Sequence, residues 1–328
     1  ALAEQLQGTF AEPFRVGEGE CLELRVKSFI GLAAAPEHGG VAIDLLRKVD
    51  LAKHMAKSEE RGGVFTFHAG IEHDRASRRE LERGMRQALD EGQFHLHYQP
   101  KFALGSGEPA GAEALLRIGG DVGLSATEVV ATAERAGLMG ALGVLVIEGV
   151  EEQLGDWLTD PVAERMAMVN VAPQQLADRD FMKLIEMIAD HEELASRFGF
   201  EIAAPAALDN LDLIATVTER LGGRVGFGID GWSDLSTSLS TITDVGASYL
   251  KLHRNLVSKL PINEASRIRT GRLISEAQSL GIEVFATGIE KEAEVDALVE
   301  AGCTRGQGFL FAPAVSAEEF LRTADITV

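Results

Sequence analysis

Gly111-Ala112-Glu113-Ala114-Leu115-Leu116-Arg117 is a short apolar run that carries one carboxylate and ends in a cation. Other short apolar runs follow, each carrying or ending in a polar residue and separated by helix-length amphipathic stretches: 166–170, 200–202, 225–230 and 249–251. Apolar strands that alternate with helices predict a parallel α/β fold. In a β/α barrel the polar groups at successive strand ends face one end of the barrel, where its chemistry occurs.

The strand pattern predicts the fold class. Strands are expected near 94–99, 111–117, 166–171, 198–203, 225–230, 247–252, 282–287 and 306–311. Eight strands with intervening helices over roughly 235 residues fit a single (β/α)8 barrel, here 93–328. An open doubly wound sheet is the alternative, but no Gly-rich phosphate loop follows a first strand.

The residues before the barrel predict two smaller parts. In 1–70, a helical pattern at 43–57 is followed by Gly62-Gly63 and a short strand at 64–67, which is half of an α/β domain. In 71–92, Leu81, Met85 and Leu89 form an i, i+4 stripe in a charged segment, which predicts a linker helix. The chain begins as if inside a helix, so we expect a fragment of a longer protein, with an upstream sensor or membrane anchor left open.

Composition narrows the classes of partner. The formal net charge is −20, which argues against a nucleic-acid groove and against contact with an anionic membrane. The two cysteines, Cys21 and Cys303, suggest neither a disulfide framework nor a zinc site, so a cytoplasmic location is the default expectation. A small anionic ligand needs local Arg, Lys or metal to overcome the general field.

Several motifs together resemble one family. Tyr98-Gln99-Pro100, Glu113-Ala114-Leu115-Leu116-Arg117, Asn170 and Gln307-Gly308-Phe309, in this order, resemble the EAL domain. The resemblance implies a modified TIM barrel that hydrolyses cyclic di-GMP to pGpG with two Mg²⁺ or Mn²⁺ ions. Residues 10–67 resemble the C-terminal half of a GGDEF (diguanylate cyclase-like) domain through Ser28-Phe29-Ile30-Gly31, Val49-Asp50, and Ala56-Lys57 with Arg61. Its signature loop is absent from this sequence, so no cyclase activity is expected here.

The resemblance also assigns residues. The metal ligands it implies are Glu113, Asn170, Glu201 and Asp230, hard oxygen donors suited to Mg²⁺ or Mn²⁺. Contacts to cyclic di-GMP are implied for Gln99, Glu113, Leu115, Arg117, Asn170, Asp230, Lys251 and Gln307. The guanidinium of Arg117 suits a phosphate. Lys251 matches the lysine that positions the attacking water, and Glu290 matches the second glutamate of the motif after strand seven.

The departures concentrate where hydrolysis would occur. The family's second aspartate after strand five, a ligand of the second metal, is Gly231, and the glutamate proposed as base is Thr287. Glycine cannot ligate a metal, and a threonine hydroxyl is not basic near neutral pH. Lys251 and Glu290 are then remnants without catalytic function, and one ion at most is expected. The family's Lys-Ile-Asp is Lys251-Leu252-His253, and the glutamate of the dimer-associated loop is Ala204.

These observations favour a catalytically inactive receptor that binds cyclic di-GMP and signals through an unknown protein partner. A weak phosphodiesterase with one metal is the enzymatic alternative. A protein-interaction module without nucleotide affinity is the third reading, motivated by Ala204 and the altered loop at 231–238. The family's barrel-mediated homodimer is weakened by the same loop. Trp232 is expected to be an apolar plug rather than a stacking residue.

Overall fold

The computed structural model describes residues 2–10, 14–16, 22–24, 26, 28–58, 63–119, 126–158, 166–233 and 237–324. The chain divides into two compact units, residues 1–83 and 84–328, and the division falls inside helix α3 (Ala69–Asp90). This helix covers most of the expected linker. The boundaries predicted at 70 and 92 stay predictions.

The first unit is a small α/β arrangement. Its elements are α1 (Leu2–Gly8), β1 (Phe14–Val16), β2 (Leu22–Leu24), β3 (Ile30–Leu32), α2 (Ala42–Ser58) and β4 (Val64–Thr66). The helix expected at 43–57 is α2. Strands β3 and β4 pair in parallel, and Leu51 and Ala52 of α2 pack with Phe67. The α2 helix therefore covers this two-stranded sheet.

The second unit contains a closed sheet. Its strands are β5 (Phe94–Ala103), β6 (Pro109–Ile118), β7 (Ala167–Asn170), β8 (Phe198–Ala203), β9 (Gly226–Trp232), β10 (Tyr249–Leu252), β11 (Glu283–Ala286), β12 (Arg305–Gly306) and β13 (Val315–Ser316). They pair in sequence order from β5 to β12, and a β12–β5 pairing closes the ring. The predicted α/β barrel is confirmed.

Two details differ from an eightfold parallel barrel. Strand β5 runs antiparallel to its neighbours in the ring, β6 and β12, and the short strand β13 also pairs with it antiparallel. A parallel neighbour needs a crossover of a dozen or more residues, and the β5–β6 connection is too short for one. The eighth strand, expected near 306–311, is present as β12, but its predicted bounds are wrong, because β12 spans only Arg305–Gly306. A Cβ at Gly308 would lie 2.0 Å from the Ile289 carbonyl oxygen, so the chain there passes too close to other backbone to extend the ladder.

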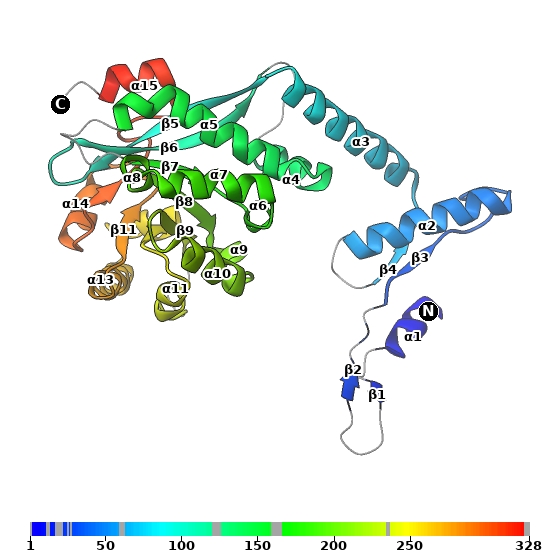
Figure 1. Ribbon diagram of the computed structural model, residues 1–328. Helices are drawn as coiled ribbons and strands as arrows, with labels where there is room; N and C mark the ends of the chain where they lie inside the picture. The colour runs from blue at the N-terminus through cyan, green and yellow to red at the C-terminus, as the bar shows by residue number, and fades with distance from the viewer. Residues whose placement is uncertain are drawn as a thin grey trace. The chain divides into compact units, whose positions relative to one another are not determined.

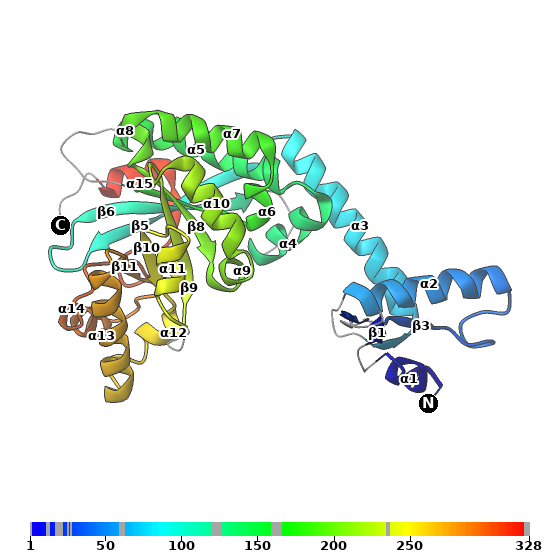
Figure 2. The same cartoon turned by 60° about the horizontal axis from the view of Figure 1, so that its bottom comes forward.

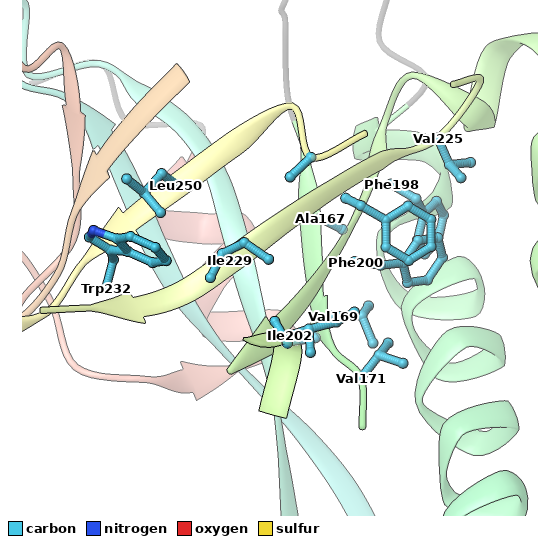
Figure 3. Close-up of a cluster of buried hydrophobic side chains, with 14 of the residues drawn as sticks. Ala167, Val169, Val171, Phe198, Phe200, Ile202, Val225, Ile229, Trp232 and Leu250 are labelled. Carbon is cyan, nitrogen blue, oxygen red and sulfur yellow. The ribbon is translucent and has the colours of Figure 1, made fainter. Parts of the chain in front are cut away.

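Helices lie outside the strands (Figures 1 and 2). They are α4 (Ala126–Ala136), α5 (Met139–Leu158), α6 (Pro173–Leu176), α7 (Arg179–Asp190), α8 (Glu192–Ala195), α9 (Ala204–Leu208), α10 (Leu211–Leu221), α11 (Ser240–Asp244), α12 (Arg254–Val257), α13 (Glu264–Ser279), α14 (Glu292–Glu300) and α15 (Ala317–Ala324). Figure 3 shows the neighbouring side chains Val169, Phe198 and Phe200 of the core. No helix in the described residues is long and apolar enough to cross a membrane.

Because successive side chains of a strand point to opposite faces, one set points into the barrel interior and the alternate set points outward. Met168, Tyr249 and Phe285 form a small buried cluster of their own. Because side chains two positions apart share a face, Asn170, Lys251 and Thr287 lie on the same interior side, one layer nearer the strands' C-terminal ends. The polar site therefore rests on an apolar floor.

The apolar floor of Met168, Tyr249 and Phe285 packs tightly against Gly228. A Cβ at Gly228 would lie 2.0 Å from the Tyr249 ring. Gly228→Ala should lower the free energy of unfolding by about 1–3 kcal/mol, because the ring has to shift in a filled interior. Chemical denaturation measures the change. Gly105→Ala, where no atom lies within 4 Å of the new Cβ, is the control. Equal stability of the two variants would show that the floor is loosely packed.

Candidate functional site

Lys251 lies at the centre of the polar layer inside the barrel. Its Nζ is 2.7 Å from Glu113 Oε2, 2.6 Å from Glu201 Oε2 and 3.4 Å from Asp230 Oδ1. Lys251 and Glu201 are each 1% exposed, so solvent does not screen their ion pair. Carboxylates from β6, β8 and β9 thus converge on one ammonium group from β10. The structure therefore brings together four of the residues that the sequence analysis assigned to the site.

Amide side chains complete the hydrogen bonding of Glu113. Asn170 Nδ2 donates to Glu113 Oε1 at 2.7 Å, and Gln307 Nε2 donates to Glu113 Oε2 at 2.6 Å. Gln307 Nε2 also lies 3.2 Å from Gln99 Oε1. Gln307 is brought here by the segment that follows β12. The predicted residues from β5, β6, β7 and this segment therefore form one connected network.

A second buried ammonium, Lys101, was missed by the sequence reasoning. Its Nζ donates to Glu201 Oε1 at 3.0 Å and lies 5.1 Å from the centre of the Phe285 ring. Lys101 is two positions after Gln99 on β5, so the strand period alone places both on the interior face. That spacing was the available signal. With Lys101, both oxygens of Glu201 are paired with ammonium groups.

The electrostatics of the network favour an ionised Glu113. Burial alone would raise the pKa of Glu113, but the Lys251 and Lys101 ammonium groups hold it at about 2. Burial alone would lower the pKa of Lys251, but Glu113 and Glu201 raise it above its usual value. Complete burial raises the pKa of Glu201 and lowers the pKa of Lys101. In both groups the opposite charge of the partner acts in the other direction, but burial has the larger effect.

The low pKa of Glu113 predicts a pH dependence of stability. A carboxyl whose pKa falls from 4.5 to about 2 on folding stabilises the protein fully above pH 4.5. That contribution, on the order of 3 kcal/mol, is lost as pH falls through the window from 4.5 to 2. Denaturation curves at several pH values should show Glu113→Gln flattening this decline relative to the unmodified chain. Parallel declines in both proteins would contradict the assignment.

The two departures from the family pattern lie at the ends of β9 and β11, on either side of β10. Gly231 has φ +75°, a left-handed conformation that favours glycine. Thr287 Oγ1 donates to the Leu252 carbonyl oxygen at 2.8 Å, so its proton is already engaged. Glu290 is exposed, and its backbone N–H donates to Glu294 Oε2. At 231 and 287 the chain therefore presents no charged or basic side chain.

The four predicted metal ligands come together, but not as an open coordination sphere. Lys251 occupies the space between three of them, and both Glu201 oxygens are paired with ammonium groups. In the described part of the chain, no three or more His, Cys, Asp or Glu side chains are arranged to hold a metal ion. In this arrangement the set does not fit Mg²⁺ or Mn²⁺, because the ammonium would have to leave first. Binding of one ion by this set stays a prediction.

Two cavities open beside the network. The mouth pocket, of about 330 Å³, is lined by Gln99, Glu113, Leu115, Asp230, Gly231, Lys251, His253, Arg254, Thr287, Gly288, Glu290, Gln307, Gly308 and Phe309. A second, mainly apolar pocket of about 520 Å³ lies between β6, α4 and α5 and includes Leu115, Arg117 and Asn170. The predicted ligand residues are thus shared between adjacent pockets, with Leu115 in both. Glu201 lines neither.

Two aromatic residues near the mouth, Trp232 and Phe309, differ in their exposure to solvent. Trp232 is 1% exposed and lies near Leu250 in the core (Figure 3), which confirms the apolar plug. Phe309 is 72% exposed at the rim, where an unpaired base could stack on it. The sequence reasoning assigned no role to Phe309. The sequence signal for a role of Phe309 at the site was its position directly after Gln307-Gly308.

Comparison with known proteins agrees with this geometry. Residues 82–314 match the model of the EAL domain family. The chain belongs to the EAL domain family. It is 27% identical to the signaling protein YkoW of Bacillus subtilis, over 97% of this chain and 40% of that protein. It is also 27% identical to the bifunctional diguanylate cyclase/cyclic di-GMP phosphodiesterase MucR of Pseudomonas aeruginosa, over 98% of this chain and 47% of that protein.

A solved structure has the same fold. The MucR phosphodiesterase in complex with cyclic di-GMP matches with a TM-score of 0.65 at 27% identity, covering 74% of this EAL chain and 99% of that chain. EAL structures of this kind bind cyclic di-GMP, and EAL phosphodiesterases use Mg²⁺ or Mn²⁺. The chain spans about half or less of the length of the curated relatives named here.

Proposed function

We propose that this EAL domain binds cyclic di-GMP without hydrolysing it and passes the bound state to a protein partner. The observation that carries the proposal is the pair of uncharged positions at the mouth, Gly231 and Thr287. A positioned general base contributes roughly 10²–10⁴-fold to a rate, and the Thr287 hydroxyl cannot supply that. The residues assigned to ligand binding are retained beside Thr287. A site that keeps its binding groups and lacks its catalytic base is typical of a receptor.

Binding is supported by the chemistry of the two pockets. Among the described residues, Arg117 donates to the Leu116 carbonyl at 2.9 Å through one guanidinium nitrogen, which leaves its remaining N–H groups for a phosphate. Gln99 and Gln307 offer amide groups, and Phe309 offers an aromatic face for a guanine. A cyclic dinucleotide carries both phosphates and bases, so it can use all of these contacts.

A weak phosphodiesterase is the second candidate, because relatives such as MucR carry that activity in their names. It requires the Lys251 ammonium to leave the space between Glu113, Glu201 and Asp230 before an ion can enter. The N-terminal segment as half of a GGDEF-like domain is likewise a proposal. The matched relatives extend over it, whereas the family model begins at residue 82. Homodimerisation and a cytoplasmic location are further proposals.

Calorimetry with cyclic di-GMP tests the proposal. We expect binding, and we expect Arg117→Ala to weaken it by about 10–100-fold, the usual effect of losing a charge-assisted hydrogen bond. Arg269→Ala, which removes an exposed arginine on α13, is the matched control and should bind normally. No heat of binding in the unmodified chain would favour the nucleotide-independent interaction module. Steady formation of pGpG would favour the phosphodiesterase.

A further inference from the structure

Two residues directly after β10, His253 and Arg254, lie on the rim of the mouth pocket. His253 is half-buried and Arg254 is exposed. Neither belongs to the predicted ligand set. They line the same pocket as Gly231 and Thr287, the positions where the family pattern has carboxylates. This rim therefore combines uncharged strand ends with basic side chains.

The hydrogen bonding of His253 fixes which ring nitrogen can donate. His253 Nδ1 accepts the Asn255 backbone N–H at 3.2 Å, which caps helix α12. In a neutral imidazole the proton then resides on Nε2, which has no acceptor among the described residues. The ring Cδ2 lies 3.8 Å from the point where a Cβ at Gly231 would be. The imidazole thus lies beside the space that a side chain at 231 would occupy.

The stem of Arg254 packs across a second glycine. A Cβ at Gly288 would lie 2.6 Å from Arg254 Cβ, so the absence of that side chain lets Arg254 cross the end of β11. In the described part of the chain, its guanidinium has neither an ion pair nor a hydrogen bond. A planar guanidinium with unused N–H groups matches the oxygens of a phosphate.

We propose that His253 and Arg254 form a phosphate-binding edge that holds a phosphodiester of the bound nucleotide without a divalent ion. The assignment rests on the proposed function and specifies how its ligand is held. An anion in this pocket needs local donors, because the chain has a net charge of −20 and Lys251 is already paired with three carboxylates. Glu290 lines the same pocket, but its side chain is exposed, so solvent screens its repulsion.

The test is calorimetry of the whole chain with cyclic di-GMP in EDTA. The unmodified chain should bind under these conditions. Arg254→Ala and His253→Asp should each weaken binding by about 10–100-fold. Aspartate at 253 can still cap α12, so this variant removes the donor and adds a negative charge while the local fold is kept. Arg267→Ala, an exposed arginine on α13 outside the pocket, should change affinity less than twofold and controls for net charge.

The outcomes separate this assignment from the proposed function. Binding that vanishes in EDTA and returns with Mg²⁺ would overturn the assignment alone, since an ion then holds the phosphate. Unchanged affinity in both folded variants would also overturn it alone. A chain that binds no cyclic di-GMP with or without Mg²⁺ would overturn the receptor function together with this edge. Thermal melts of the variants establish that they are folded.

Discussion

Lys251→Met is expected to lower the free energy of unfolding by about 3–5 kcal/mol, because it leaves buried carboxylates without their shared cation. Glu113 is 6% exposed and Glu201 1% exposed, so water cannot replace the ammonium group without opening the barrel. Methionine has a similar length, which limits the contribution of lost packing. Urea denaturation measures the difference.

Lys259→Met provides the control for the lysine substitution. Lys259 is exposed after helix α12 and has no ion pair in the described part of the chain. Its replacement should change the free energy of unfolding by no more than about 0.5 kcal/mol. If Lys251→Met were equally mild, the carboxylates around it would have to be solvated, and the ion-pair cluster would not hold the barrel's interior together.

The double variant Gly231→Asp, Thr287→Glu should gain hydrolysis of cyclic di-GMP from an undetectable baseline. It returns a carboxylate to each of the two uncharged positions, and a positioned base alone contributes roughly 10²–10⁴-fold. At φ +75° a residue other than glycine is strained, but aspartate tolerates this region better than most. Chromatographic detection of pGpG in the presence of Mg²⁺ or Mn²⁺ measures the gain.

The shape-matched variant Gly231→Asn, Thr287→Gln separates charge from sterics. It adds side chains of the same size without a carboxylate, so it should remain inactive. Activity in this control would mean that hydrolysis does not depend on the restored charges. Equal rates of pGpG formation in the unmodified chain and the aspartate–glutamate variant would mean that Gly231 and Thr287 do not limit the reaction.

Much of the barrel could be predicted because its strands carry a strong local pattern. Short apolar runs at 166–171 and 198–203 correspond to β7 and β8, and Asn170 and Glu201 on these strands are partners in register. The direction of β5 was less visible, although the short connection to β6 already excluded a parallel pair. The local sequence pattern therefore predicts where strands lie more readily than it predicts the direction in which they run.

The last strand and parts of the site depend on contacts distant in sequence. Gly308 lies against the backbone of Ile289. The hydrophobic pattern at 306–311 does not indicate this contact. Lys101 was missed because an isolated lysine in an apolar strand gives no sign of its partner Glu201, which is 100 residues away in the sequence. His253 was noted only as a departure, since its position beside Gly231 requires the folded β9–β10 pair.

The most direct test of the receptor claim is the fate of the nucleotide in the bound complex. The chain should be loaded with cyclic di-GMP, incubated for hours with Mn²⁺ and denatured, and the released nucleotide identified by mass spectrometry. Our account predicts recovery of intact cyclic di-GMP in proportion to the protein. Recovery of pGpG in amounts that grow with time would contradict it.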